Sequence, residues 1–212
     1  MQPNFSIYDN CREFERQLSV YTGAPHVVVV DNNCNGLFLA MRYFITTGTI
    51  LEGDEIRIPS HTYVGVPYAI KAARLKPVFD PSPEYLTGEY RLGRLPLWDS
   101  ALRFTSGMYR PGQVQGLSFT GPFKHMKIQK GGAILTDSKA IADWIRRSRF
   151  SGRGEMSYHD DVFTHPEGYN MYLPAMLATM GAQMMTGVAL HNPDLTLKYP
   201  DLSLPHHTAF NT

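Results

Sequence analysis

The most constraining feature of the chain is the run at residues 26–31, HVVVVD, in which β-branched residues follow one another without interruption. Such a continuous run is typical of a strand that is buried on both faces of a sheet. Residues 35–44 then have helical spacing, so the segment predicts a strand, a turn and a helix. We therefore expect an α/β fold, in which short buried strands alternate with crossover helices.

Further apolar runs and helical patterns extend this prediction along the chain. Strands are expected at residues 55–59, 76–80, 95–99, 114–119 and 132–136, and helices at residues 63–74, 138–149 and 172–188. The last helix is rich in Met and Ala and is expected to lie buried against the sheet or another subunit. We expect residues 1–190 to form the folded domain and residues 191–212, which lose periodicity and gain proline, to form an extended tail.

Composition excludes several classes of protein. The chain has 212 residues, of which 43% are hydrophobic, and this is enough to form a substantial core. Lys and Arg number 20 against 19 Asp and Glu, without a long run of either sign, so we expect no nucleic-acid or membrane partner. Cys11 and Cys34 are too few for a disulfide framework, and the N-terminal residues lack the pattern of a signal peptide. These features predict a soluble cytoplasmic protein.

Polar residues follow several of the predicted strands, where ligands of α/β sheets bind. The turn at residues 32–36 (NNCNG) opens a helix, and it either binds a phosphate or only caps the helix. Tyr63 either covers a flat ligand or belongs to the core. Asp99 ends an apolar predicted strand. It is either a buried carboxylate, which needs a cationic or hydrogen-bonding partner, or the cap of a helix. Lys124 lies in a loop interrupted by glycine and proline.

These pieces, in this order, resemble the large domain of the DegT/DnrJ/EryC1/StrS family of pyridoxal-phosphate sugar aminotransferases. The matching stretches are NNCNGLFLAM, EGDEIRIPSHTYVGVPYAI, LWDSA, SFTGPFKHMKIQKGGAILTD and GYNMYLPAMLATMGAQM. The resemblance implies the three-layer fold of the type I pyridoxal-phosphate transferases, with a mixed, mostly parallel sheet. The family's small C-terminal domain is expected to be absent, since the chain leaves no room for it after Leu190.

The resemblance also implies pyridoxal 5'-phosphate as cofactor and a role for each site residue. Lys124 would form the internal aldimine, a Schiff base with the cofactor, and Asp99 would pair with the pyridine nitrogen. Tyr63 would stack on the ring. The phosphate would be bound by Asn33, Cys34 and Ser118, together with Asn170 from the neighbouring subunit. The family thus implies a homodimer with a shared active site, which takes an amino donor and aminates a keto-sugar, nucleotide-linked, or a similar carbonyl.

Several departures from the family pattern leave an alternative open. Cys34 replaces a hydroxyl residue, Leu102 a glutamine and Tyr172 an arginine. The loop before Lys124 is one residue longer than the family's, so His125 lies beside the expected lysine, and a related dehydratase branch has histidine in the lysine position. The alternative is a non-catalytic or dehydratase-like protein that binds the cofactor or a nucleotide-sugar without transamination.

Other readings concern the remaining segments. A metal-dependent hydrolase would use four residues of one loop, His159, Asp160, Asp161 and His165, with His206 and His207 of the tail. Lys127 and Lys130 are alternatives to Lys124 as the Schiff-base lysine. Residues 81–94 are too few for the strand and helices that the family has there, and the tail, with Tyr199 and Phe210, has side chains that suit a contact with a neighbouring subunit.

Overall fold

A six-stranded sheet forms the centre of the computed structural model, which describes residues 8–210. Its strands lie in the order β1-β7-β6-β5-β4-β8. Their bounds are His26–Val30 for β1, Gly132–Thr136 for β7, Val114–Ser118 for β6, Leu97–Leu102 for β5, Tyr85–Arg91 for β4 and Thr196–Lys198 for β8. A separate parallel pair is formed by β2 (Glu55–Pro59) and β3 (Lys76–Asp80).

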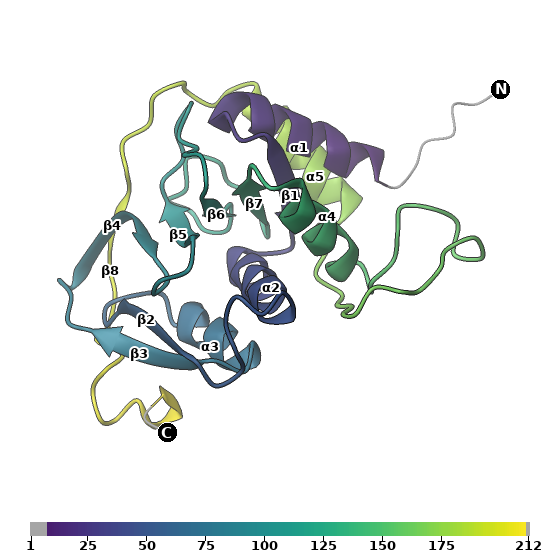
Figure 1. The fold of residues 1–212 in the computed structure, drawn as a ribbon. Helices are drawn as coiled ribbons and strands as arrows, with labels where there is room; N and C mark the ends of the chain where they lie inside the picture. Colours follow the sequence, from purple (N-terminus) through teal and green to yellow (C-terminus); the bar gives the residue numbers. More distant parts are fainter. Residues whose placement is uncertain (1–7, 211–212) are drawn as a thin grey trace.

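Helices cover both faces of the six-stranded sheet (Figure 1). On one face, α1 (Asp9–Thr22) packs beside α5 (Ala175–Met185). On the other face lie α2 (Asn33–Thr46) and α4 (Lys139–Ser148), while α3 (Gly65–Ala72) packs against α2 and β3. A single 3-10 turn, Thr208–Phe210, lies near the end of the described chain. The predicted α/β class and its three layers are confirmed.

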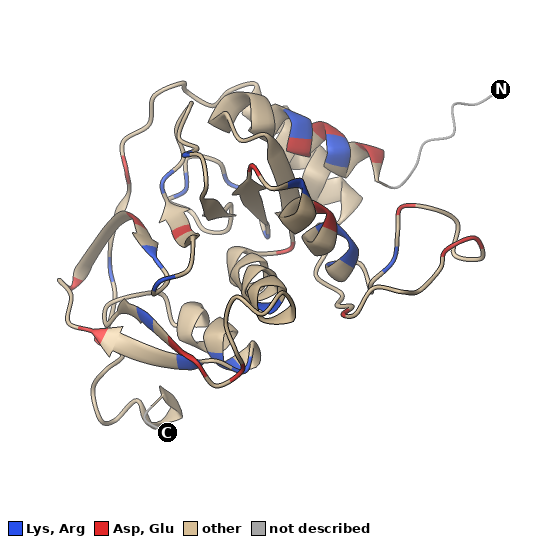
Figure 2. Cartoon of the chain, viewed as in Figure 1, with Lys and Arg blue, Asp and Glu red and all other residues tan. Residues whose placement is uncertain are grey.

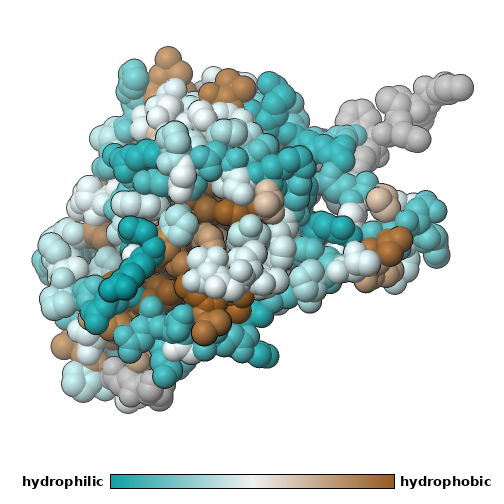
Figure 3. Space-filling model, in the orientation of Figure 1, coloured by the Kyte–Doolittle hydropathy of each residue, from teal (hydrophilic) through white to brown (hydrophobic). Residues whose placement is uncertain are grey.

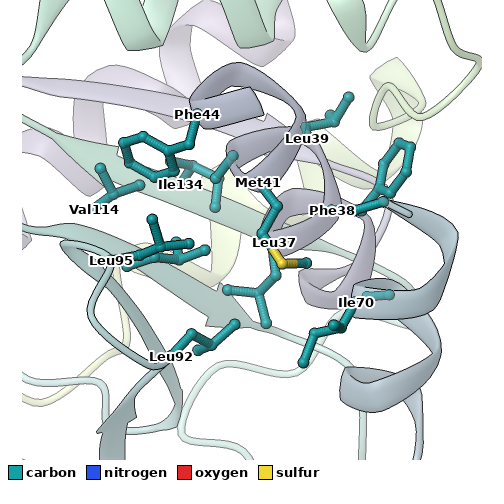
Figure 4. Packing of buried hydrophobic residues seen from close by; sticks show 14 of the residues in the cluster. Leu37, Phe38, Leu39, Met41, Phe44, Ile70, Leu92, Leu95, Val114 and Ile134 are labelled. Carbon is teal, nitrogen blue, oxygen red and sulfur yellow. The ribbon is translucent and has the colours of Figure 1, made fainter. Parts of the chain in front are cut away.

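The valine run at residues 27–30 is buried on both faces, as its sequence predicts. Val28 and Val30 of β1 belong to the core on the α2 side, whereas Val27 and Val29 belong to the core on the α1 side. Side chains alternate between the faces of a strand, so a strand between two helical layers needs apolar residues at every position. Figure 4 shows the core under α2, where the helix packs its apolar face against the sheet.

The sheet is mixed, as expected, but most of its neighbouring strands run antiparallel rather than parallel. Only β5 and β6 pair in parallel within the six-stranded sheet, and the other neighbouring pairs are antiparallel. Connection length explains one of these antiparallel pairs, β4 with β5. Five residues separate β4 from β5, and so short a connection joins antiparallel neighbours, whereas a parallel pair needs a crossover of a dozen residues or more. The prediction of a mostly parallel sheet was therefore wrong in this detail.

Most predicted elements are present, with small shifts at their ends. The strands at 55–59, 76–80 and 132–136 match β2, β3 and β7, whereas the strand expected at 95–99 begins two residues later, at Leu97. The sequence reading did not anticipate α1, β4 or β8. It judged residues 81–94 too short for the family's strand and helices there, and yet this segment contains β4.

The segment after Leu190 packs on the body of its own chain. Its strand β8 pairs with β4, the amide of Leu202 donates to the carbonyl of Ser60 at 2.9 Å, and Asp201 forms a bridge with His61. The ring of Phe210 contacts Tyr68 and Phe79 edge-on. Residues 191–210 thus make contacts within their own chain, and their contact with a neighbouring subunit stays a prediction. Residues 1–7 begin the predicted domain and residues 211–212 end the predicted tail, and both lie outside the described residues. Residues 1–7 also belong to the N-terminal stretch that lacks the pattern of a signal peptide.

The distribution of charge agrees with the near balance of the sequence. Basic and acidic residues lie close together on α1, as Figure 2 shows. Within residues 8–210, no helix combines the length and the apolar character that crossing a membrane requires.

Candidate active site

A cavity of about 590 Å³ lies where β1, β5 and β6 end and α2 begins. Six of the seven predicted site residues line it, namely Asn33, Cys34, Tyr63, Asp99, Ser118 and Lys124. They come from segments far apart in the sequence and meet because neighbouring strands end at the same edge of the sheet. The cavity is also lined by Val66, Ala101, Phe123, Leu197 and Tyr199, among others, so much of its wall is apolar.

Asp99 is a buried carboxylate whose oxygens accept three hydrogen bonds. Its Oδ1 accepts from the side-chain amide of Asn33 at 2.8 Å and from the backbone amide of Ala101 at 3.0 Å. Its Oδ2 accepts from the phenol of Tyr90 at 3.1 Å. Burial raises the pKa of Asp99, and the three donors and the nearby Lys124 ammonium oppose this increase. The carboxylate is thus held inside the protein by polar partners, as its isolated place in an apolar strand requires.

Lys124 brings an amine to the same cavity. Its Nζ donates to the carbonyl oxygen of Ala101, two residues beyond Asp99. Burial lowers the pKa of Lys124, while the negative charge of Asp99 partly opposes this shift. A lowered pKa increases the neutral fraction of the amine, and the neutral form is the nucleophile. The geometry therefore places an amine of lowered pKa and a buried carboxylate in one cavity.

The N-terminus of α2 forms another part of the wall. The Asn32 side chain caps the helix by accepting from the amide of Asn35 at 2.9 Å, and Asn33 and Cys34 occupy the first turn. Amides of a first turn have no partner within the helix, and together with the helix dipole they favour an anion. Burial, with a smaller effect of Asp99, raises the pKa of Cys34 to about 12. Cys34 is therefore a neutral thiol beside this turn.

Aromatic side chains from two distant segments complete the cavity. Tyr63 follows β2, lines the cavity and remains 54% exposed. Tyr199 and Leu197 come from the segment after Leu190, which β8 attaches to the edge of β4. Burial raises the pKa of Tyr199 to about 12, with smaller contributions from Asp99 and Tyr63, and the phenol therefore stays protonated.

Other predicted residues lie elsewhere. Asn170 is exposed, forms a bridge with Phe150, and does not line the cavity of its own chain. The ring of His125, next to Lys124, contacts the carbonyl of Pro193 through Nε2 at 2.8 Å, outside the cavity lining. Lys130 forms an ion pair with Asp31 at 2.9 Å.

The residues proposed for a metal site do not converge. His165 Nε2 lies 2.6 Å from the Ser148 hydroxyl, and Asp161 accepts from the amide of Gly154 at 2.7 Å. Among residues 8–210, no three His, Cys, Asp or Glu side chains are grouped as metal ligands would be. The geometry does not support the hydrolase reading, which needs several ligands converging on one ion.

Sequence reasoning missed the residues that surround Asp99 and close the cavity from β4 and β8. Tyr90 and Tyr199 are the clearest cases, because both lie on or next to strands that were not predicted. The one available signal was the alternation in the segment TGEYRLG, where a glycine interrupts an otherwise strand-like pattern.

Comparisons with known proteins agree on one family. The model of the DegT/DnrJ/EryC1/StrS aminotransferase family matches residues 2–87 and 109–192. No protein of curated function matches the chain. The segment between the two matched parts contains Tyr90 and Asp99, so the structure rather than the family match places Asp99 in the cavity and Tyr90 against it.

Solved structures share the fold at low sequence identity. DesV from S. venezuelae, in complex with a ketimine intermediate, has a TM-score of 0.64 at 21% identity, over 88% of this chain and 58% of DesV. The sugar aminotransferase CalS13 from Micromonospora echinospora gives 0.65 at 18%, over 85% and 61%. NtdA from Bacillus subtilis, with bound cofactor PMP, gives 0.64 at 17%, over 84% and 48%. The chain thus spans about half to three fifths of the length of these proteins.

Proposed function

Because this chain belongs to the DegT/DnrJ/EryC1/StrS aminotransferase family, we propose that it binds pyridoxal 5'-phosphate and transfers an amino group to a keto-sugar. Lys124 is the residue proposed to hold the cofactor covalently. The observation that carries the proposal is the shared cavity of Lys124 and Asp99, an amine and a buried carboxylate facing one space beside the first turn of α2. Each of these groups suits a different part of the cofactor.

The residues present fit the cofactor. Asp99 suits the ring nitrogen, because a carboxylate accepts a hydrogen bond from a protonated pyridine and stabilises its charge. The first turn of α2, with Asn33 and Cys34, and the Ser118 hydroxyl suit the phosphate. Gly132 lets the backbone come close at this point, since a Cβ there would lie 2.6 Å from the amide nitrogen of Asn33. Tyr63, an aromatic side chain in the cavity wall, suits the flat ring.

The bound cofactor would supply an aldehyde that bonds to amines and a ring that accepts an electron pair from a neighbouring carbon. Lys124 would hold the cofactor and, once displaced by an amino substrate, would be free to move a proton as a base. Its pKa, lowered by burial, suits both tasks because a larger fraction of the amine is neutral. Asp99, fixed by three hydrogen bonds, would hold the proton of the ring nitrogen in place.

The substrate class rests on relatives. CalS13 is described as a sugar aminotransferase and PseC from Helicobacter pylori as an aminotransferase in the biosynthesis of pseudaminic acid. Both are longer than this chain, which covers 61% and 59% of them. We accordingly propose that the amino donor is a small molecule and that the acceptor is a nucleotide-linked keto-sugar.

We also propose a homodimer in which Asn170 completes the phosphate site of the partner. Asn170 is exposed and bridges Phe150, so the two residues close the base of the loop between them, and Asn170 is available to a second copy. Figure 1 shows a loop projecting beside α4. The same loop exposes Met156, Tyr158, Val162 and Phe163, and brown hydrophobic atoms are visible there in Figure 3. A monomer in sedimentation equilibrium, with the cofactor bound, would count against this arrangement.

A single-turnover experiment tests the proposed reaction. The cofactor-loaded protein is mixed with L-glutamate, then with L-glutamine, and absorbance follows the conversion of the cofactor from its aldehyde to its amine form. Conversion is expected in the wild type and in Lys127→Ala, whose exposed lysine lies outside the cavity, but not in Lys124→Ala. If neither amino donor converts the cofactor bound to the wild-type protein, the result would contradict the aminotransferase proposal and favour the non-catalytic alternative.

A further inference from the structure

The strand that family comparison does not cover supplies a side chain to the candidate site. Residues 88–108 fall between the two segments matched by the family model, and they include most of β4 and all of β5. Tyr90 of β4 lies directly opposite Asp99 of β5 in the antiparallel register. Opposed residues of antiparallel strands place their side chains on the same face of the sheet, within contact distance.

An irregularity in β4 sets the direction of Tyr90. The pairing of β4 with β5 shifts register between Gly88 and Tyr90, and Gly88 has a φ of +68°, a left-handed conformation that favours glycine. Such a bulge re-aims the side chains that follow it. A Cβ at Gly88 would also lie 2.4 Å from the Asp194 carboxylate, so this carboxylate leaves no room for a side chain at the bulge.

The hydrogen bonds around Tyr90 have a defined direction. An ionised carboxylate only accepts, so the phenol must donate its proton to Asp99 Oδ2, at 3.1 Å. The Thr62 hydroxyl, 2.7 Å from the same phenol oxygen, must then be the donor to Tyr90. Thr62 is fully buried, and Tyr90 is half-buried, with its phenol oxygen bonded to both Thr62 and Asp99. The chain of donation therefore runs from Thr62 through Tyr90 to Asp99.

The hydrogen bonds to Asp99 leave one acceptor position of its carboxylate free. A carboxylate has about four lone-pair positions. Asn33 and Ala101 fill those of Oδ1, and Tyr90 fills one of Oδ2. One position of Oδ2 remains for a donor in the cavity.

We propose that Tyr90 is a positioning residue that fixes Asp99 so that the last acceptor position of Oδ2 receives the N–H of a bound pyridinium ring. This inference rests on the proposed cofactor and extends it to a residue outside the matched segments. Tyr90 has a second effect, because its O–H stabilises the ionised carboxylate. Without it Asp99 is a stronger base, and the proton shared with the ring moves from the ring nitrogen towards Oδ2.

The test uses pyridoxal phosphate labelled with nitrogen-15 in its ring, bound to the full chain. The nitrogen-15 chemical shift reports whether the ring nitrogen carries the proton, and a titration of absorbance reports affinity. In Tyr90→Phe we expect the signal to move towards that of a neutral pyridine and the affinity to fall about tenfold, as for a lost hydrogen bond to a charged group. Tyr109→Phe is the matched control, because its phenol donates to the Gln113 carbonyl at 2.9 Å and lies outside the cavity.

The readouts separate the possible outcomes. The titratable groups nearest Asp99, namely Lys124, Cys34 and Tyr199, are present in every variant, so pH-dependent changes common to all of them cancel. Thr62→Val removes only the donor to Tyr90, and a smaller shift in the same direction is expected; this variant carries the test if Tyr90→Phe does not fold. An unchanged nitrogen-15 signal in the folded variants would overturn the role of Tyr90. A wild-type protein that binds no cofactor would instead overturn the proposed function.

Discussion

Gly116 and Gly132 leave the space in which Asn33 reaches Asp99. Gly116 lies in β6 beneath the start of α2, and a Cβ there would lie 2.3 Å from Asn33 Oδ1 and 2.9 Å from a methyl carbon of Leu37. The side chain of Asn33 is buried, and its amide is the donor that holds Asp99 Oδ1. These two glycines therefore act through packing rather than through backbone conformation.

Replacing Gly116 by alanine is expected to displace Asn33. The added methyl group overpacks a filled region, which costs about 1–3 kcal/mol of unfolding free energy, and it weakens the hydrogen bond from Asn33 to Asp99. Urea denaturation and a titration with pyridoxal phosphate measure the two effects. Gly112→Ala is a control for added volume, because Gly112 has open space around it, although its positive φ adds some strain. Unchanged stability and cofactor affinity in Gly116→Ala would show that Asn33 is not constrained in this way.

At the scale of residues, the sequence predicted most of what meets in the cavity. Lys124 and the turn before α2 follow strands β6 and β1, while Asp99 lies within β5, and these strands end at one edge. Tyr90 escaped prediction because its partner lies across a strand pairing that depends on the bulge at Gly88. Asn170 is predicted to act on another subunit, so a single chain gives no test of it.

A buried ion pair attaches α1 to the sheet. Glu15 of α1 accepts from the backbone amide of Val29 at 3.0 Å and from Arg149 at 2.8 Å, and a third bond comes from Arg146 at 3.1 Å. Glu15 and Arg149 are both buried. Arg149 also donates to the Val29 carbonyl, so one cluster joins α1, β1 and the end of α4.

Removing one partner of this cluster should be costly. Glu15→Ala leaves the Arg149 guanidinium buried without its carboxylate, and the expected loss is about 3–5 kcal/mol of unfolding free energy. The matched control is Glu13→Ala on the exposed face of the same helix, where the ion pair with Arg16 at 2.7 Å is solvent-exposed and contributes at most about 1 kcal/mol. Chemical denaturation of both variants decides the matter, and equal losses would show that burial of the cluster adds no stability.

At the scale of elements, success followed the strength of the local pattern. Strands β2, β3 and β7 are continuous apolar or alternating runs and were predicted with their observed bounds. Helix α1 carries Cys11, Phe14, Leu18 and Tyr21 at helical spacing, a signal that was present but not used. Strands β4 and β8 have weak patterns of their own and exist because each pairs with the other, and β4 also with β5. Pairing of this kind depends on tertiary structure.

The whole molecule combines a familiar three-layer fold with a site walled by segments from three regions of the chain. Helix α2 and strands β5 and β6 bring the polar groups, while Leu197 and Tyr199 close the cavity from the segment after Leu190. In the longer relatives this chain corresponds to about three fifths or less of the protein. In this structure the segment that follows α5 covers part of the site within the same chain.

The central claim is that Lys124 carries the cofactor, and borohydride trapping tests it most directly. The purified chain is incubated with pyridoxal phosphate, reduced and digested, and mass spectrometry locates the modified lysine in the wild type, Lys124→Ala and Lys127→Ala. We predict a single modified site at Lys124, present in the wild type and in Lys127→Ala and absent from Lys124→Ala. Modification spread over exposed lysines, with the same yield in all three proteins, would contradict the claim.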